Sequence, residues 1–184
     1  MINVMTLEQL AELVQGTVFN PEPQAETFSS VSKDTRSLQK GDLYIALRGD
    51  NFDGHQFLTQ ALEKQAVAAL VEKIDESVLL PQVQVESTLL ALGQLAEHNR
   101  EQFTGTLVAV TGSAGKTTVK QLMASVLSQE FNTLMTQGNL NNHIGAPLTL
   151  LEINKDHTAA VIELGASAEG EIAYTAQWVK PQVG

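Results

Sequence analysis

Residues 107–120 read LVAVTGSAGKTTVK, and this stretch decides the fold. Its first four residues, 107–110, are all apolar, which is typical of a strand buried on both faces of a parallel sheet. Two glycines follow, Gly112 and Gly115, and a helical pattern begins at Lys116. A strand, a glycine-rich turn and a helix start predict a loop whose backbone N–H groups hold a phosphate.

The side chains of this loop suit the same purpose. Lys116 supplies a cation for the β- and γ-phosphates of ATP, and the hydroxyl of Thr117 is a ligand for Mg2+. The alternative is a glycine-rich turn without a ligand, because the motif is the shorter G-x-x-G-K-[ST] form, with Val110 where the longer form has glycine. The cofactor-binding residues predicted here are Gly112, Ser113, Ala114, Gly115, Lys116, Thr117 and Thr118.

Composition narrows the class of protein. The chain has 184 residues, a net charge of −10 and no cysteine. The negative charge argues against a nucleic-acid partner, which needs clustered lysine and arginine, and the lack of cysteine excludes disulfides and thiolate metal sites. Neither a signal-peptide pattern nor an apolar run of membrane-spanning length is present, so we expect a cytoplasmic protein without membrane insertion.

The first part of the chain reads as a small α/β domain. Helices are predicted over 6–15, with Thr6 as N-cap, and over 56–64. Strands are predicted over 43–47 and 67–71. We place this domain at residues 1–83.

The second part alternates helices and strands, which predicts a doubly wound parallel sheet. We place it at residues 84–184, and its last residues, 181–184, suit the start of another strand. The predicted helices cover 87–103, 116–129 and 171–179, and the predicted strands cover 107–110, 132–136 and 158–164.

Glu163 stands at the end of the apolar strand 158–164. A buried carboxylate is costly without a counter-charge, and Mg2+ beside the phosphate loop would supply one. Glu163 is therefore the candidate metal ligand with Thr117, and a catalytic candidate with Lys116. The alternative is a glutamate exposed at the strand tip.

Two further polar stretches are candidates for ligand contact. Residues 137–147, QGNLNNHIGAP, follow a predicted strand, where ligands of open parallel sheets bind, although asparagine and glycine also make turns without a ligand. Asp34, Thr35 and Arg36 could hold a phosphate or a base edge. Spacing alone favours an Asp–Arg pair that braces a turn.

Five segments in this order resemble the Mur ligase family over almost the whole chain. They are SKDTRSLQKGDLYIALRG, NFDGHQF, VTGSAGKTTVK, TQGNLNNHIGAPLTLL and VIELGASAEGEI. The asparagine loop and the last segment are most similar to the member that adds D-alanyl-D-alanine to UDP-N-acetylmuramoyl-tripeptide in peptidoglycan synthesis.

The resemblance implies an ATP-dependent ligase that forms an acyl phosphate and then an amide bond. It implies an N-terminal domain for the UDP end of the substrate, a central ATPase domain and a C-terminal domain. Mg2+ would bind Thr117 and Glu163. The uridine-side motif would be Ser32, Asp34, Thr35 and Arg36, and Asn139 and Asn142 would line the nucleotide and substrate cleft.

The resemblance also sets expectations about what is missing. The later central-domain residues and the C-terminal domain have no counterpart in this sequence. We therefore expect the first half of a phosphate-loop ATPase domain, a monomer that does not ligate by itself. Two alternatives stay open: a nucleotide-binding module without ligase chemistry, and a sister Mur ligase that adds a diamino acid.

Overall fold

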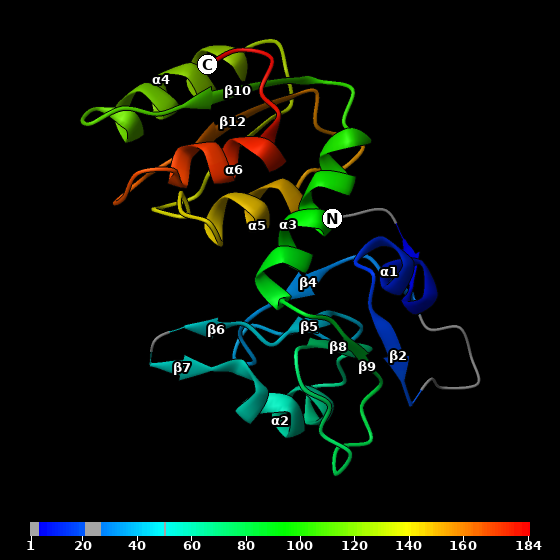
Figure 1. The fold of residues 1–184 in the computed structure, drawn as a ribbon. Coiled ribbons are helices and arrows are strands. Elements are labelled where there is room, and N and C mark those ends of the chain that lie inside the picture. The colour runs from blue at the N-terminus through cyan, green and yellow to red at the C-terminus, as the bar shows by residue number, and fades with distance from the viewer. Residues whose placement is uncertain (1–3, 21–26, 50) are drawn as a thin grey trace. The chain divides into compact units, whose positions relative to one another are not determined.

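The computed structural model describes residues 4–20, 27–49 and 51–184, and the chain forms two compact units (Figure 1). The first unit extends to Leu95 and the second begins at Ala96, so helix α3 (Thr88–Glu101) contributes to both. Among the described residues, none of the helices combines the length and the hydropathy that a bilayer crossing requires.

A five-stranded sheet forms the centre of the first unit. Its strands lie in the order β2 (Thr17–Phe19), β9 (Gln82–Gln84), β8 (Ala68–Val71), β5 (Leu43–Ile45) and β4 (Val31–Ser32). Strands β9 to β4 are parallel, whereas β2 pairs antiparallel with β9. All residues of β5 and β8 are buried, which explains why their sequences show no alternation of apolar and polar residues.

Short elements complete this unit. Strand β1 (Met5–Thr6) pairs antiparallel with β3 (Thr27–Phe28), and β6 (Arg48–Gly49) pairs with β7 (Phe52–Asp53). Helix α1 (Leu7–Leu13) begins with the predicted cap, in which Thr6 and Gln9 exchange side-chain-to-backbone hydrogen bonds. The helix predicted over 56–64 consists of a 3-10 turn, η1 (Gly54–Phe57), followed by α2 (Leu58–Glu63).

The second unit is the predicted doubly wound arrangement. Its parallel strands lie in the order β10 (Thr106–Val110), β12 (Ala159–Glu163) and β11 (Thr133–Met135). Figure 1 shows α4 (Lys116–Leu127) on one side of this sheet, and α5 (Gly145–Leu151) and α6 (Glu171–Val179) on the other. Val183 bridges Val108 in parallel, so the chain's last residues do occupy a strand position beside β10.

Strand register places the functional loops. Val110, the last residue of β10, pairs with Glu163, the last residue of β12. Because both strands are parallel, the loops that follow them leave the sheet at the same edge. The phosphate loop and the Glu163 side chain therefore start from neighbouring positions.

Helix α4 packs through a narrower face than its apolar pattern suggests. Ala124 packs in a buried cluster with Val110 and Val161. Leu122 and Val126, which belong to the same apolar pattern, are 63% and 71% exposed. A buried lysine on this helix, Lys120, lies at the carboxyl edge of the sheet, where it meets Glu163.

Two residues near the end of α3, Asn99 and Arg100, bind backbone carbonyls at the ends of α5 and α6. The Asn99 amide donates hydrogen bonds to the carbonyls of Leu150 and Ile153 at 2.7 and 3.1 Å. The buried Arg100 guanidinium donates to the carbonyls of Val179 at 2.9 Å and Lys180 at 3.0 Å, where α6 ends. Arg100 thus satisfies carbonyls that a helix end leaves without an intrahelical partner.

Replacement of Arg100 by methionine should strongly destabilise the second unit. It leaves buried carbonyls without a donor, and we expect the free energy of unfolding to fall by about 2–4 kcal/mol. Urea unfolding followed by circular dichroism measures this change. The matched control is Lys155→Met, which removes a positive charge from an exposed position of the same unit; equal losses in the two variants would contradict the proposed anchoring.

Candidate functional site

The loop between β10 and α4 has an open backbone suited to an anion. Gly112 and Gly115 have φ angles of 147° and 77°, a region that favours glycine. Gly115 is the N-cap of α4 and offers no side-chain cap, so the first N–H groups of this helix stay available. Residues 111–115 are exposed. A helix of twelve residues with such a start is a site for phosphate.

Lys116 lies over this loop. Its Nζ donates a hydrogen bond to the carbonyl of Gly112 at 2.7 Å. The side chain is only half-buried, so it can exchange this carbonyl for an anionic oxygen in the loop.

Glu163 joins three neighbouring elements at the carboxyl edge of the sheet. Its Oε1 accepts hydrogen bonds from Asn141 Nδ2 at 2.8 Å and from Thr117 Oγ1 at 3.4 Å. Its Oε2 lies 3.1 Å from Lys120 Nζ, and both side chains are 2% exposed. The structure therefore brings Thr117 and Glu163 together, as the strand order suggested, and surrounds the carboxylate with donors.

The charge of Glu163 follows from these contacts. Burial raises the pKa of its carboxyl group, but the Asn141 amide and the adjacent Lys120 ammonium outweigh burial and lower it. The group is a carboxylate at neutral pH. The backbone N–H of Glu163 donates a hydrogen bond to Thr136 Oγ1 at 2.9 Å, which ties the end of β12 to the residue that follows β11.

One carboxylate oxygen fits a cation. Oε2 of Glu163 is buried and has the Lys120 ammonium at 3.1 Å, but no partner with hydrogen-bond geometry among the described residues, which is rare for a buried polar atom. A carboxylate and a hydroxyl are ligands that Mg2+ accepts, so Glu163 and Thr117 suit such an ion. Within the described residues no group of three or more His, Cys, Asp or Glu side chains could hold a metal. Other oxygens, such as those of a nucleotide, would have to complete its coordination.

The asparagine loop contributes a different residue from those expected. Asn142 Oδ1 accepts hydrogen bonds from the N–H groups of Ile144 and Gly145 at 3.1 and 2.8 Å, so it caps the start of α5. Asn139 is exposed. The asparagine that contacts Glu163 is Asn141, which sequence reasoning did not select. A Cβ on Gly165 would lie 2.9 Å from the Asn141 side chain, so only glycine permits this approach.

Lys120 was the other residue that sequence reasoning missed. It belongs to the helix that carries Lys116, and its Nζ also donates to the carbonyl of Gly138 at 3.2 Å. A signal was present, because Lys120 is four residues from Ala124 and so shares the helix face that packs on the sheet. A lysine on that face needs a buried partner.

The residues around Arg36 form a braced turn in the first unit. Arg36 contacts the Asp34 carboxylate at 2.5 Å, and its side chain is 88% exposed. Hydrogen bonds from the Arg36 side chain, and then from its backbone, lower the pKa of Asp34 to about 2. Ser32 and Thr35 are buried: Ser32 donates to the Asp34 carbonyl at 3.0 Å, and Thr35 donates to Gln60 Oε1 at 3.0 Å. The turn thus presents its guanidinium outward on a fixed base.

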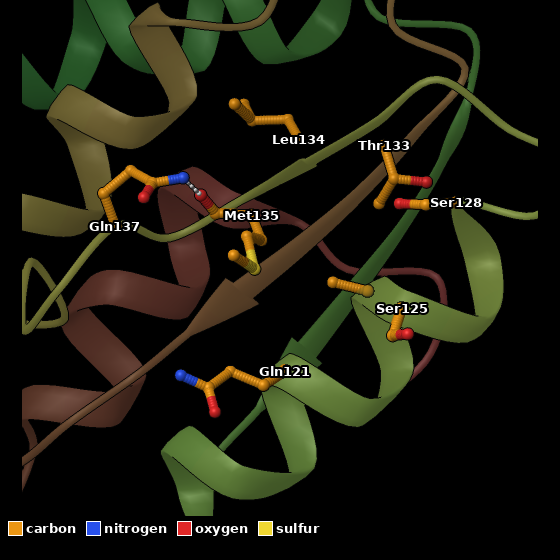
Figure 2. A pocket seen from close by; sticks show the side chains of 8 residues that line it. Gln121, Ser125, Ser128, Thr133, Leu134, Met135 and Gln137 are labelled. Carbon is orange, nitrogen blue, oxygen red and sulfur yellow. Dashed lines mark hydrogen bonds between the residues drawn. The ribbon is translucent and has the colours of Figure 1, made fainter.

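A cavity of about 300 Å³ lies on another flank of α4. Figure 2 shows that its lining comes from α4 and from β11, with the Gln137 amide bonded to the Met135 carbonyl. None of the residues expected to bind a nucleotide or a substrate lines it. The lining residues are Gln121, Ala124, Ser125, Ser128, Thr133, Leu134, Met135 and Gln137.

Comparison with curated proteins gives close relatives along nearly the whole chain. The chain is 46% identical over 182 residues to UDP-N-acetylmuramoyl-tripeptide–D-alanyl-D-alanine ligase of Escherichia coli (strain K12), covering 99% of this chain and 39% of that protein. The ligase of the same name from Bacillus subtilis (strain 168) is 40% identical over 181 residues, covering 96% and 39%. The chain spans about two fifths of the length of these relatives.

Solved structures agree with the fold. MurF from Acinetobacter baumannii superposes with a TM-score of 0.91 at 40% identity, covering 98% of this chain and 40% of that one. MurF ligase from Thermotoga maritima in complex with ADP superposes with a TM-score of 0.75 at 34% identity, covering 83% and 35%.

Domain matches cover both parts of the sequence. Residues 27–100 match the catalytic domain of the Mur ligase family, and residues 110–184 match the Mur ligase middle domain. The phosphate loop, the strand end at Glu163 and the asparagine loop all fall in the second match. Since two domains of one family account for most of the sequence, the chain belongs to the Mur ligase family.

Proposed function

We propose that this chain is part of an ATP-dependent amide ligase that joins D-alanyl-D-alanine to UDP-N-acetylmuramoyl-tripeptide in peptidoglycan synthesis. The names of the relatives support this substrate pair. The observation that carries the proposal is the contact of Thr117 with Glu163 beside an uncapped helix start. Phosphoryl transfer needs this equipment, because it depends on positioning and charge neutralisation.

Each predicted site residue of the second unit has a role in this proposal. The backbone of Gly112 to Thr118 wraps the ATP phosphates, and Lys116 contacts the β- and γ-oxygens. Thr117 and Glu163 would hold Mg2+, which would neutralise phosphate charge when bound. Asn139 and Asn142 lie in the loop that would border the nucleotide, where Asn142 acts by fixing the backbone.

The reaction has two steps. The terminal carboxylate of the tripeptide attacks the γ-phosphorus of ATP, and ADP leaves. The amine of D-alanyl-D-alanine then attacks the carbonyl carbon of the acyl phosphate and loses a proton, and inorganic phosphate leaves as the amide bond forms.

The first domain, residues 1–83 in this proposal, binds the UDP end of the substrate, and residues 84–184 bind ATP. Ser32, Asp34, Thr35 and Arg36 would form the uridine-side contact, with Arg36 as the cation that meets the phosphates. Because ATP and UDP-linked precursors are cytoplasmic, the cytoplasm is the compartment that this proposal implies. A monomeric form stays a prediction, which analytical ultracentrifugation measures.

Lys116→Ala should weaken binding of a non-hydrolysable ATP analogue by about tenfold or more, since a charged hydrogen bond contributes about 1.5–3 kcal/mol. Calorimetric titration of the chain in MgCl2 measures this loss. In the complete ligase the same change should abolish phosphate release that depends on D-alanyl-D-alanine. Unchanged analogue binding would point to a protein whose loop 111–115 holds no triphosphate.

Arg36→Ala should act on the other ligand. We expect binding of UDP-N-acetylmuramoyl-tripeptide to weaken several-fold, because the guanidinium contributes a charge-assisted contact, while ATP-analogue affinity stays unchanged. Titration of each variant with each ligand gives the comparison. If Arg36→Ala lowers affinity for the ATP analogue alone, the assignment of the two ligands to the two domains is wrong.

A further inference from the structure

Lys120 is a buried cation that the proposed ligase chemistry does not use. Its side chain is 2% exposed, so its ammonium cannot follow a ligand out of the protein as the Lys116 side chain can. Its Nζ is held between Glu163 Oε2 at 3.1 Å and the Gly138 carbonyl at 3.2 Å.

The pair formed by Lys120 and Glu163 is electrically neutral. A divalent cation that approaches the Glu163 carboxylate therefore meets a fixed positive charge beside it. Mg2+ gives up its water reluctantly and is usually bound by one or two carboxylates together with substrate phosphates. Without phosphates, the neutralised Glu163 carboxylate and the Thr117 hydroxyl bind a divalent cation only weakly.

We propose that Lys120 is a positioning residue that acts as the internal counter-ion of Glu163 and keeps divalent cations from binding there until the nucleotide phosphates arrive. This inference rests on the proposed ATP and Mg2+ site. The nucleotide brings several negative charges, so the fixed ammonium and the metal ion can then lie on the same carboxylate. Lys120 would thus make metal binding conditional on nucleotide binding.

The arrangement of Glu163 supports an ordering role as well. Asn141 and Thr117 hold Oε1, and Lys120 holds the side of Oε2. The carboxylate is fixed in place before any ligand binds, since these three groups restrict its rotation. Oε2 has the Lys120 ammonium beside it but no hydrogen-bond partner among the described residues, so it is the carboxylate oxygen with room for a metal contact once the phosphates are present.

The test is the affinity for Mn2+ in the absence of nucleotide, read from the electron paramagnetic resonance signal of free Mn2+. The Lys120→Met variant should bind Mn2+ at least about tenfold more tightly than the wild-type chain, because even at the dielectric of water a unit charge about 5 Å away has this effect on a divalent ion. A merely structural lysine would give the opposite result, a variant that binds more weakly or no differently.

Two control variants locate the effect. Lys155→Met removes a distant exposed charge and should leave Mn2+ affinity unchanged. Lys120→Met combined with Glu163→Gln should lose the gained affinity, because the carboxylate is then absent. A gain that survives Glu163→Gln would place the metal elsewhere and overturn the inference.

Loss of Lys120 leaves the buried Glu163 carboxylate without its positive partner, so the variant can be less stable than the wild-type chain. In that case the readout is the shift of the apparent melting temperature on addition of Mn2+. This shift should be larger in Lys120→Met than in the wild-type chain, because a ligand that binds the folded state more tightly stabilises it more. An equal or smaller rise contradicts the inference.

A last measurement separates this inference from the proposed function. If the wild-type chain binds Mn2+ with ATP analogue present and Lys120→Met gains nothing without it, the counter-ion role fails and the ATP site stands. If neither protein binds Mn2+ with the analogue present, the metal site itself is wrong.

Discussion

The second unit depends on how one buried carboxylate is compensated. Glu163 ends a strand in which every residue is buried, and an ionised group in that position is costly unless donors and a cation surround it. Thr117 from α4, Asn141 from the loop after β11 and Lys120 from the next turn of α4 supply them. The carboxylate therefore fixes the phosphate loop, the asparagine loop and the strand end relative to one another.

Lys116 and Lys120 lie on the same helix but differ in burial, and this difference suits them to different roles. Lys116 is half-buried beside a loop of exposed residues and donates a hydrogen bond to the Gly112 carbonyl at 2.7 Å, a contact within the loop that an incoming anion can replace. Lys120 stands one turn further on and is almost completely buried against Glu163. The same side chain type thus supplies a mobile cation at the surface and a fixed one in the interior.

Much of this arrangement follows from the sequence, because each part has a strong local cause. The apolar run before Gly112 and the helical pattern after Gly115 predicted strand, turn and helix, and the parallel-strand rule then put Glu163 at the same edge of the sheet. Lys120 was not predicted, since a lysine within a helix is exposed in most proteins and its partner lies more than forty residues away in the chain. The choice of Asn141 over its neighbours could not be predicted either, because it depends on a turn in which the Asn141 N–H donates to the Asn139 carbonyl.

The central claim is that the phosphate loop and Glu163 act together on a triphosphate and its metal. The most direct measurement is calorimetric titration of the wild-type chain and of Glu163→Gln with a non-hydrolysable ATP analogue, each with MgCl2 and with EDTA. The account predicts that Mg2+ strengthens analogue binding in the wild-type chain and that Glu163→Gln removes most of this dependence. Analogue binding that is equally strong with and without Mg2+ in the wild-type chain, or equally Mg2+-dependent in both proteins, would contradict it.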